Sequence, residues 1–545
     1  MFRTSRTLAV CIGIMAMPGL ACASPTTPPP SQPPASLANA EQVNALANGH
    51  WLAQEKNALR LLAADGRELA RLAMRADHLD SRSTPGGALA LVFDDVRQQP
   101  MLIDIDLKLN RMSVGAVLPE PAFSLASQCL YRDGQQWVHA FLIGEDGQAE
   151  QWLLSGPAPR LLRKLALPPL VEACRVDDAH HTLHVSEEGI GDWAYTLDGE
   201  SVPPRRLVAA RVSAAQAAVS RNLPIVEPQA QTEPVARRGD AADDPAIWIH
   251  PRDPAQSLIL ATNKKQGLLS YDLAGKTRQL LEVGRVNNVD VRQQVKLAGR
   301  TLPVDLALAT QRDEKALAVF EIDADGKIRD VARIATDLDD IYGTCLYQPL
   351  GGGLEVIAND KDGHFVQYRI DWRDNAYVGV PLRRFSVASQ PEGCVADDRA
   401  GRLFIGEEDQ GIWTLPADAL ADAAAPHLVL PVGPRLVADV EGLALYHGTR
   451  ASYLIASSQG DNSYVVLDAQ PPFNYRGAFR IGINAMAGID AVSETDGLEV
   501  TALDLGGPYQ QGMLVVQDGF NRMPDAPQNF KLVAWKDIAR ALGLD

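Results

Sequence analysis

The sequence, 545 residues long, predicts an all-β fold in which one domain is present twice. Three observations lead to this prediction: short runs of alternating apolar residues, glycine-containing turns between the runs, and an internal repeat of long period. Short antiparallel strands at regular spacing build a sandwich, a barrel or a propeller. The strand pattern alone does not choose among these three architectures.

The expected strands cover most of the chain. Ser257–Tyr271, Ala316–Ile322 and Glu355–Ile370 contain alternating apolar runs, and turn sequences such as DG, DADGK or GG separate the strands. Helical periodicity is weak and is confined to Val208–Ser220 and Trp535–Leu544. We therefore expect strands and turns almost throughout.

Two acidic segments show the internal repeat most clearly. Val171–Trp193 and Pro391–Trp413 align without a gap and agree at 9 of 23 positions, including a cysteine, an Asp-Asp pair, a Glu-Glu pair and a tryptophan. Three further segment pairs follow in the same order: 102–106 with 319–323, 127–134 with 343–350, and 141–152 with 356–368. The first copy lacks counterparts for both ends of the second. We expect a truncated domain at 45–207, a linker at 208–227 and a complete domain at 228–545.

The N-terminal residues have the features of an export signal. Residues 1–23 combine a basic start, an apolar run and the A-x-A site Ala21-Cys22-Ala23, which predicts a signal peptide cleaved after Ala23. A lipoprotein anchored at Cys22 is the alternative. Residues 24–44 are rich in proline and are expected to form a tether. We expect a secreted or periplasmic protein with no membrane-spanning segment after the signal is removed.

The net charge of −17, from 51 basic and 68 acidic residues, argues against a nucleic-acid partner. It permits hard cations, or an anionic small-molecule substrate that arrives with cations. Solvation of a large surface explains part of the acidic excess equally well. We expect the protein to act as a monomer.

Carboxylate-rich loops suggest a hard cation as ligand. DAADDPAIW (240–248) has three carboxylates within five residues, which suits calcium-like ions, although an Asx turn before a strand would give the same pattern. More acids stand at expected strand boundaries: Glu392, Glu407, Glu408, Asp409, Asp439, Glu441, Asp490, Asp496 and Asp518. Each alone fits a solvated loop. Gathered on one face of a propeller, they would repel one another without a metal.

Isolated cations accompany these acids, namely Lys264, Lys265, Arg312 and Lys361, and Tyr342 adds a hydroxyl. Surface ion pairs would explain them, but such pairs contribute only ~0–1 kcal/mol each. Together with metal ions, the cations would form a phosphate-binding site.

A series of motifs resembles the β-propeller phytases. In order they are DDPAIW, TNKKQGLLSYDL, NNVDVR, IYGTCLY, EGCVADD, EEDQGIW, DVEGLALY, ASSQGDNSY, TDGLEV, VVQDGFN and NFKLVAWKDIA, and they span residues 228–545. The shortened first copy is similar to that of the dual-domain members. The resemblance implies a six-bladed propeller and calcium-dependent hydrolysis of phosphomonoesters of phytate (myo-inositol hexakisphosphate), as in a 3-phytase. The nucleophile would be a calcium-bridging water that attacks phosphorus directly.

The resemblance also implies roles for individual residues. The implied calcium ligands are Asp243, Asp244, the carbonyls of Pro245 and Val289, Asn288, Glu392, Glu408, Asp439, Glu441, Gln459, Asp490 and Asp518. The implied catalytic residues are Glu392 and Glu441, which would bridge ions at the cleaved phosphate, with Lys264, Arg312, Tyr342 and Lys361; these last four and Lys265 would bind substrate. Gln231 stands where the family often has a glutamate, which puts one calcium site in question, and Phe520 stands where an acidic residue is usual, which puts in question the calcium supported by Asp490 and Asp518.

The first copy has lost the implied phosphate-binding groups. Lys264, Arg312, Tyr342 and Lys361 align with Glu55, Asp95, Ala126 and Glu145. Because an acid repels phosphate, we expect this domain to be inactive. Its acidic repeat keeps Glu172, Glu187 and Glu188, which still suit a cation. The domain either assists its neighbour or has only structural value.

The cysteines persist in both copies. Cys129 and Cys174 occupy positions equivalent to Cys345 and Cys394. We expect one disulfide in each domain, with buried free thiols as the alternative.

Two other function classes fit a calcium-bearing propeller. A lactonase or esterase would need fewer cations than Lys264, Arg312 and Lys361 supply. A non-catalytic binding propeller would have no need of the retained acids.

Overall fold

The computed structural model describes residues 34, 37, 38, 40–187, 190–197, 222–419 and 425–545, together with the backbone of 205–209. The expected signal peptide, most of the tether and most of the linker lie outside these residues, as does the expected helix beyond residue 209; residues 208 and 209, expected to begin that helix and the linker, instead end a strand of the first domain. Strands dominate the described chain, and its one α-helix is α1 (Trp535–Leu542). The all-β prediction is confirmed. Among the described residues, no helix is long and apolar enough to cross a membrane.

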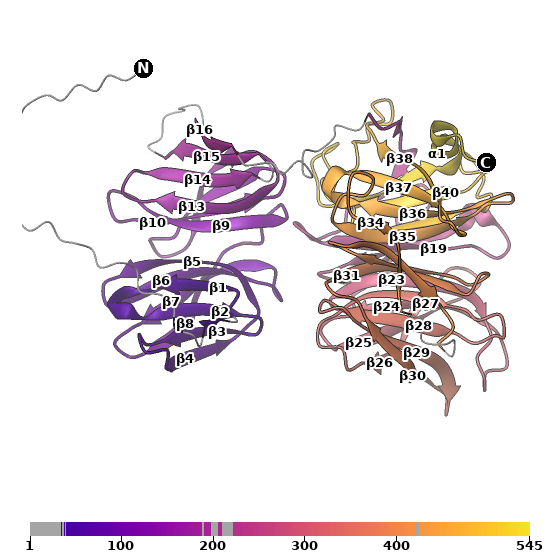
Figure 1. The fold of residues 1–545 in the computed structure, drawn as a ribbon, viewed down its shortest axis with the longest axis horizontal. Helices are drawn as coiled ribbons and strands as arrows, with labels where there is room; N and C mark the ends of the chain where they lie inside the picture. The colour runs from indigo at the N-terminus through magenta and orange to yellow at the C-terminus, as the bar shows by residue number, and fades with distance from the viewer. Residues whose placement is uncertain are drawn as a thin grey trace, which may run out of the picture.

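The second domain is a propeller of six blades (Figure 1). Blades one to three contain β19 (Ala242–Trp248), β20 (Leu258–Asn263), β21 (Gly267–Asp272) and β22 (Thr277–Leu281); β23 (Val286–Val295), β24 (Val304–Gln311), β25 (Ala316–Ile322) and β26 (Ile328–Ala335); and β27 (Ile341–Tyr347), β28 (Glu355–Asp360), β29 (His364–Arg373) and β30 (Ala376–Ser386). Blades four to six contain β31 (Pro391–Asp397), β32 (Arg402–Glu407), β33 (Gly411–Pro416) and β34 (His427–Pro431); β35 (Val440–His447), β36 (Ser452–Ser458), β37 (Ser463–Asp468) and β38 (Tyr475–Ile481); and β39 (Leu498–Thr501), β40 (Met513–Asp518) and β41 (Asn529–Ala534).

The six blades form a closed ring. Their first strands pack in succession from β19 to β39, and β39 packs against β19. Two short strands that precede the first blade complete the ring: β17 (Ile225–Val226) pairs with β38, and β18 (Ala230–Gln231) pairs with β41 as the fourth strand of the last blade. Apolar side chains fill the spaces between neighbouring blades, for example around the buried Trp248 and Phe320. The domain therefore begins at 225, slightly before the expected 228.

The first domain contains four blades. Their strands are β1 (Gln42–Ala45), β2 (Trp51–Glu55), β3 (Ala58–Leu62) and β4 (Glu68–Ala73); β5 (Ala76–Thr84), β6 (Gly87–Asp94), β7 (Gln99–Asp106) and β8 (Arg111–Val117); β9 (Leu125–Arg132), β10 (Val138–Gly144), β11 (Gln148–Leu153) and β12 (Arg160–Ala166); and β13 (Val171–Asp177), β14 (Thr182–Glu187), β15 (Gly191–Thr196) and β16 (Arg205–Ala209). β1 packs on β5, β5 on β9 and β9 on β13, but no comparable packing joins β13 to β1 among the described residues. The domain is an open arc. It begins before the expected residue 45, because Leu37 is buried against Trp51.

The duplication is visible in matching strand registers. In β13–β14 Cys174 lies opposite Val185, and in β31–β32 Cys394 lies opposite Ile405. Both predicted disulfides are present: Cys129–Cys174 and Cys345–Cys394, with Cα–Cα distances of 6.0 and 5.6 Å.

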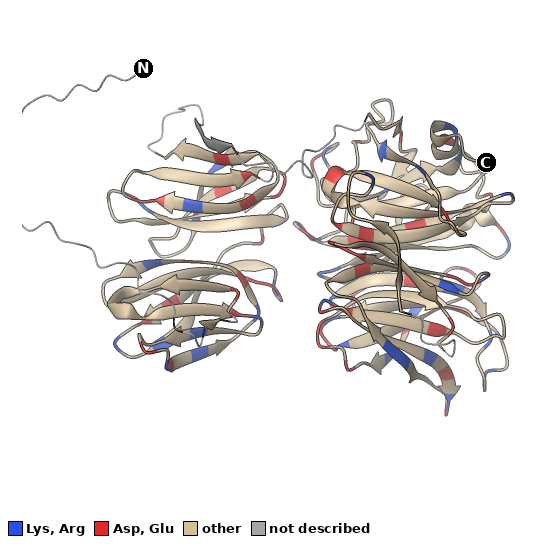
Figure 2. Ribbon diagram, in the orientation of Figure 1, with Lys and Arg blue, Asp and Glu red and all other residues tan. Residues whose placement is uncertain are grey.

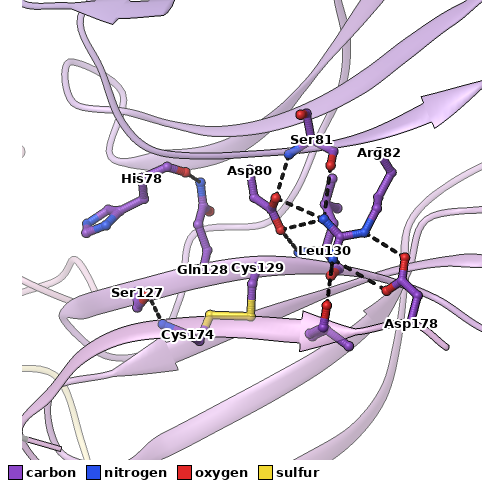
Figure 3. Close-up of a disulfide and its surroundings, with 11 residues drawn as sticks. His78, Asp80, Ser81, Arg82, Ser127, Gln128, Cys129, Leu130, Cys174 and Asp178 are labelled. Atoms are coloured by element: carbon purple, nitrogen blue, oxygen red, sulfur yellow. Dashed lines mark hydrogen bonds and ion pairs between the residues drawn. A yellow bond between two sulfur atoms is a disulfide. The ribbon is translucent and has the colours of Figure 1, made fainter. Parts of the chain in front are cut away.

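An arginine clamp beside each disulfide is also repeated. In the first domain Arg82 donates from Nε to Asp178 at 2.9 Å and from Nη1 to Asp80 at 2.9 Å (Figure 3). In the second domain Arg292 donates to Asp398 at 2.7 Å and to Asp290 at 2.8 Å. Arg82 also donates to the Leu130 carbonyl, and Arg292 to the Leu346 carbonyl, of the blade between. Each clamp therefore joins three successive blades, and the two domains share these stabilising contacts as well as their fold.

Candidate functional site

The predicted cations of the second domain lie in equivalent turns. Lys264, Arg312 and Lys361 each lie in the turn between the second and third strands of blades one, two and three, and Glu408 lies in that turn of blade four. Because successive blades repeat around one axis, these turns all emerge at the same end of the propeller. The blade repeat thus places side chains from distant parts of the chain on one face.

The first strands of the blades carry irregularities at the predicted site residues. The pairing register shifts between Ala242 and Pro245, between Ile341 and Thr344, between Pro391 and Cys394, and between Val440 and Leu443. Bulges of this kind re-aim side chains. They release Asp243, Tyr342, Glu392 and Glu441 from the regular ladder at the same end of four blades.

Glycines next to these residues allow the first strands to approach closely. A Cβ at Gly393 would lie 2.3 Å from the carbonyl oxygen of Glu441, and one at Gly343 would lie 2.1 Å from that of Glu392. No other residue fits such a distance without moving the neighbouring backbone. The glycines of the YG and EG sequences in the motifs therefore stand where the first strands pack closely at the centre of the ring.

Three glutamates meet at the centre of this face. Glu392, Glu408 and Glu441 each place one carboxylate oxygen within 4.8 Å of the others. They line a cavity of about 230 Å³, which is also lined by Lys264, Tyr342, Asp439, Gln459 and Asp496. Glu392 and Glu441 are each only 4% exposed. Buried carboxylates at this spacing repel one another strongly.

The hydrogen bonding of these acids is incomplete. Glu392 Oε1, Glu441 Oε2 and both carboxylate oxygens of Asp243 are buried without a hydrogen-bond partner. Burial raises the pKa of Glu408 to about 8, and the charge of Glu392 adds to this. Burial and the charge of Glu392 also raise the pKa of Glu441 well above its usual range. Unpaired, mutually repelling oxygens of this kind fit a calcium ion, whose charge and many ligand positions would satisfy them.

Lys264 lies among acids at the rim of the cluster. Its Nζ is 2.7 Å from Asp240, 2.8 Å from Asp496 and 3.9 Å from Asp243. Burial opposes protonation, but Asp240, Asp496 and Asp243 raise the pKa of Lys264 well above its usual range. The lysine therefore stays positively charged.

Tyr342 brings the other two cations together. Lys361 Nζ lies 4.5 Å from the centre of the Tyr342 ring, and Arg312 Cζ lies 5.5 Å from it. Arg312 also contacts Asp340 at 3.5 Å, while its Nε has no partner. Burial raises the pKa of Tyr342 well above its usual range, with Glu392 the next contribution, so the hydroxyl keeps its proton. The group offers two cations and one hydroxyl beside the carboxylates.

Other predicted ligands lie away from the three glutamates. Asp244 Oδ2 accepts a hydrogen bond from the Val289 amide at 3.0 Å, which places it beside Asn288 and Pro245. Asp490 and Asp518 lie 2.9 and 2.6 Å from the buried ammonium of Lys531. Near them Gln231 accepts a hydrogen bond from Asn529 at 3.2 Å. The roles of these residues as calcium ligands stay predictions, and Lys531 already supplies one positive charge to two of them.

Several cavity residues were not assigned roles from the sequence. Asp240 and Asp496 fix Lys264, Gln390 donates to Glu408 at 2.5 Å, and Asp496 also accepts from the implied calcium ligand Gln459 at 2.9 Å. Asp240 and Asp496 belong to acidic segments that the sequence already singles out. Only the structure shows that they act as counter-charges to a lysine.

The described residues of the first domain contain no comparable cluster. Its Glu187 accepts a hydrogen bond from Trp193 at 2.6 Å, and Glu172 is exposed; Glu188 lies outside the described residues. Among the described residues, the only group of three metal-ligating side chains with mutually close ligand atoms is Glu392, Glu408 and Glu441. The loss of the basic partners at Glu55, Asp95 and Glu145 is thus accompanied by the loss of the carboxylate centre.

The second domain has relatives of known activity. A family model described as phytase matches residues 201–545. The 3-phytase of Bacillus subtilis (strain 168) is 40% identical over 325 residues, which make up 57% of this chain and 84% of that protein.

Two solved structures also align with the chain. One is a functionally unknown protein from Desulfotomaculum acetoxidans, with a TM-score of 0.32, 10% identity, and coverage of 71% of this chain and 94% of its own. The other is Sqt1 from Saccharomyces cerevisiae, with a TM-score of 0.32, 11% identity, and coverage of 76% and 97%. Neither similarity bears on the function.

Proposed function

This chain belongs to the phytase family, and we propose that its second domain hydrolyses phosphomonoester bonds of phytate in a calcium-dependent reaction. The observation that carries the proposal is the cavity in which Glu392, Glu408 and Glu441 meet beside Lys264 and Tyr342. Phosphoryl transfer to water needs both a metal-activated nucleophile and positive charge around the phosphate oxygens. The cavity holds the residue types for both.

Glu392, Glu408 and Glu441 would hold calcium, with Asp243, Asp439 and Gln459 as further candidate ligands at the same face. Bound calcium would supply a Lewis acid and lower the pKa of a coordinated water. Asp490, Asp518, Asp244, Asn288 and the carbonyls of Pro245 and Val289 would hold ions outside the cavity.

The cations of the site would bind the substrate phosphate. Lys361 Nζ and Arg312 Cζ lie 4.5 and 5.5 Å from the centre of the Tyr342 ring. Their charges would neutralise the phosphate oxygens as negative charge shifts during P–O cleavage. Lys264, held by Asp240 and Asp496, would contact the same phosphate from the side of the carboxylates. The protonated Tyr342 hydroxyl would donate a hydrogen bond to it.

We also propose that the protein works outside the cytoplasm, as a monomer. The two disulfides support an oxidising compartment.

Phosphate release from phytate, measured with calcium and with a chelator, tests the proposal. We expect release with calcium only, and a loss of at least about 100-fold in kcat/KM for Lys361→Ala. The matched control is Lys327→Ala, an exposed lysine in a turn at the other end of a blade, which should retain wild-type activity. Release that is absent with calcium, or equal losses in both variants, would refute the proposal.

A further inference from the structure

The two domains meet through corresponding faces. In each domain the face is formed by the turns between the second and third strands of the blades and by the connections from one blade to the next, and charged residues occupy both (Figures 1 and 2). Lys56 lies 2.6 Å from Asp362, Arg75 lies 2.6 Å from Asp340, and Arg522 contacts Asp146. The active face of the second domain is therefore the one that contacts the first domain.

One contact occupies a predicted substrate-binding residue. Lys265 Nζ lies 2.8 Å from Glu120 of the first domain and donates to the Arg238 carbonyl at 2.7 Å. The Lys265 side chain is 9% exposed. A carboxylate on a lysine that would bind substrate takes the place of a phosphate oxygen, because both anions use the same ammonium protons.

A second contact reaches the cavity itself. Ser124 and Glu145 of the first domain line it together with Lys264, Glu392 and Glu441. Burial raises the pKa of Glu145 to about 8, followed by the charges of Asp240, Glu494 and Asp496, while Lys264 lowers it. Glu145 thus lies at the cavity of the neighbouring domain, in one lining with Lys264 and the acids.

A third contact involves the charge network of Arg312. Asp340 accepts from Arg75 at 2.6 Å and contacts Arg312 at 3.5 Å, and Arg75 also lies 3.2 Å from Asp95. Asp95 and Glu145 are two of the three acids that replace phosphate-binding cations in the first copy. Asp95 holds Arg75, which pairs with Asp340 of the second domain, and Glu145 lines the cavity, so both of these positions lie at the contact between the domains.

With the first domain in place, the cavity is small. Its volume is about 230 Å³, below the ~300–1,000 Å³ typical of sites for small organic ligands. An inositol ring with six phosphates is at least as large as such ligands and far more charged. It needs the space and the cations that the first domain holds.

We propose that the first domain is a built-in cover of the catalytic face, which competes with phytate for Lys265 and for the mouth of the cavity. This inference rests on the proposed function. Lys56 and Asp362, the pair exposed on both sides, contribute only ~0–1 kcal/mol, and at Lys265 a phosphate oxygen would replace the Glu120 carboxylate as the partner of the same ammonium. A highly charged substrate can therefore displace the cover without unfolding either domain.

Two double variants test whether the first domain covers the catalytic face, one by removing negative charge and the other by removing positive charge. Glu120→Gln/Asp146→Asn removes negative charge from the first domain, and Lys56→Gln/Arg75→Gln removes positive charge. Each deletes two contacts between the domains, and none of these residues has a role in the proposed chemistry. We expect both variants to lower KM for calcium phytate by about fivefold at unchanged kcat. A purely electrostatic effect on substrate attraction would move the two variants in opposite directions. Asp65→Asn/Asp106→Asn, at the opposite end of the blades, is the matched control.

A direct measurement of the closed arrangement completes the test. A carbodiimide should join Lys265 to Glu120 in the full-length protein, and calcium phytate should suppress this cross-link, as detected by peptide mass spectrometry. KM values that stay unchanged or rise in either variant, or a cross-link that phytate does not reduce, would refute the proposal that the first domain covers the catalytic face. Lack of phosphate release by the wild type refutes the proposed activity instead, and the cross-link experiment still decides whether phytate displaces the first domain.

Discussion

Lys531 Nζ lies 2.6 Å from Asp518 Oδ2, and both side chains are completely buried. The same ammonium lies 2.9 Å from Asp490. One buried lysine therefore compensates two carboxylates where the last blade meets its neighbour. Removing one partner of a buried ion pair leaves an uncompensated charge, which is more costly than the pair itself is stabilising.

Lys531→Met should lower the free energy of unfolding by about 3–5 kcal/mol, measured by urea denaturation in the presence of a chelator. Lys536→Met, a partly exposed lysine on α1, is the control and should change stability little. Equal effects in the two variants would show that the buried lysine does not compensate Asp490 and Asp518.

Glu441→Gln should lower activity in the presence of calcium and raise the melting temperature in its absence. With calcium, losing a ligand should reduce kcat/KM by at least about 100-fold, since even groups that only support a metal ligand are worth 10–100-fold. Without calcium, the neutral amide should raise the melting temperature, because it relieves repulsion with Glu392 and Glu408. A chelated variant that melts below the chelated wild type would contradict the repulsive cluster.

Glu499, which lies outside the catalytic cavity, should make the free energy of unfolding depend on pH. Burial raises its pKa to about 8, with Asp290 adding to the shift and Arg292 opposing it. An unfolded glutamate loses its proton near 4.5, so between these pH values the folded state binds the additional proton. Stability is then lost as pH rises, by at most about 1.4 kcal/mol per pH unit from this group. Glu499→Gln should flatten the curve between pH 5 and 8 in denaturation experiments; an unchanged slope would refute the assignment.

The two disulfides should contribute similarly to stability. They close segments of similar length, with sequence separations of 45 and 49. Replacing Cys345 and Cys394 with alanine should lower the unfolding free energy of the second domain by about 2–4 kcal/mol. The corresponding change at Cys129 and Cys174 should affect the first domain equally, which calorimetry with separate domain transitions can resolve. A loss confined to one domain would contradict this equivalence.

The sequence predicts the strands, the duplication, both disulfides and the residue types of the site. These features are recorded locally, in alternating apolar residues and in motifs such as EGC and IYG. The partners of Lys264 were not predictable, because Asp240 and Asp496 lie 256 positions apart and meet only through ring closure. Lys531 looks like any strand residue until its buried neighbours are known. The contact between the two domains has no local signature either, although the acids aligned with Lys264, Arg312 and Lys361 hint at it.

The pairing of Ile225 with Arg480 has a consequence for how the molecule assembles. Every blade of the first domain forms from consecutive strands, so each can fold as soon as its own segment is available. The second domain cannot close until its first and last segments have met across more than 250 residues, and contacts of such long range slow folding. The first domain is thus positioned to be complete while its neighbour is still an open ring. A protein shortened to begin after Gln231 would lack both strands that close the ring, β17 and β18, and should populate the open form.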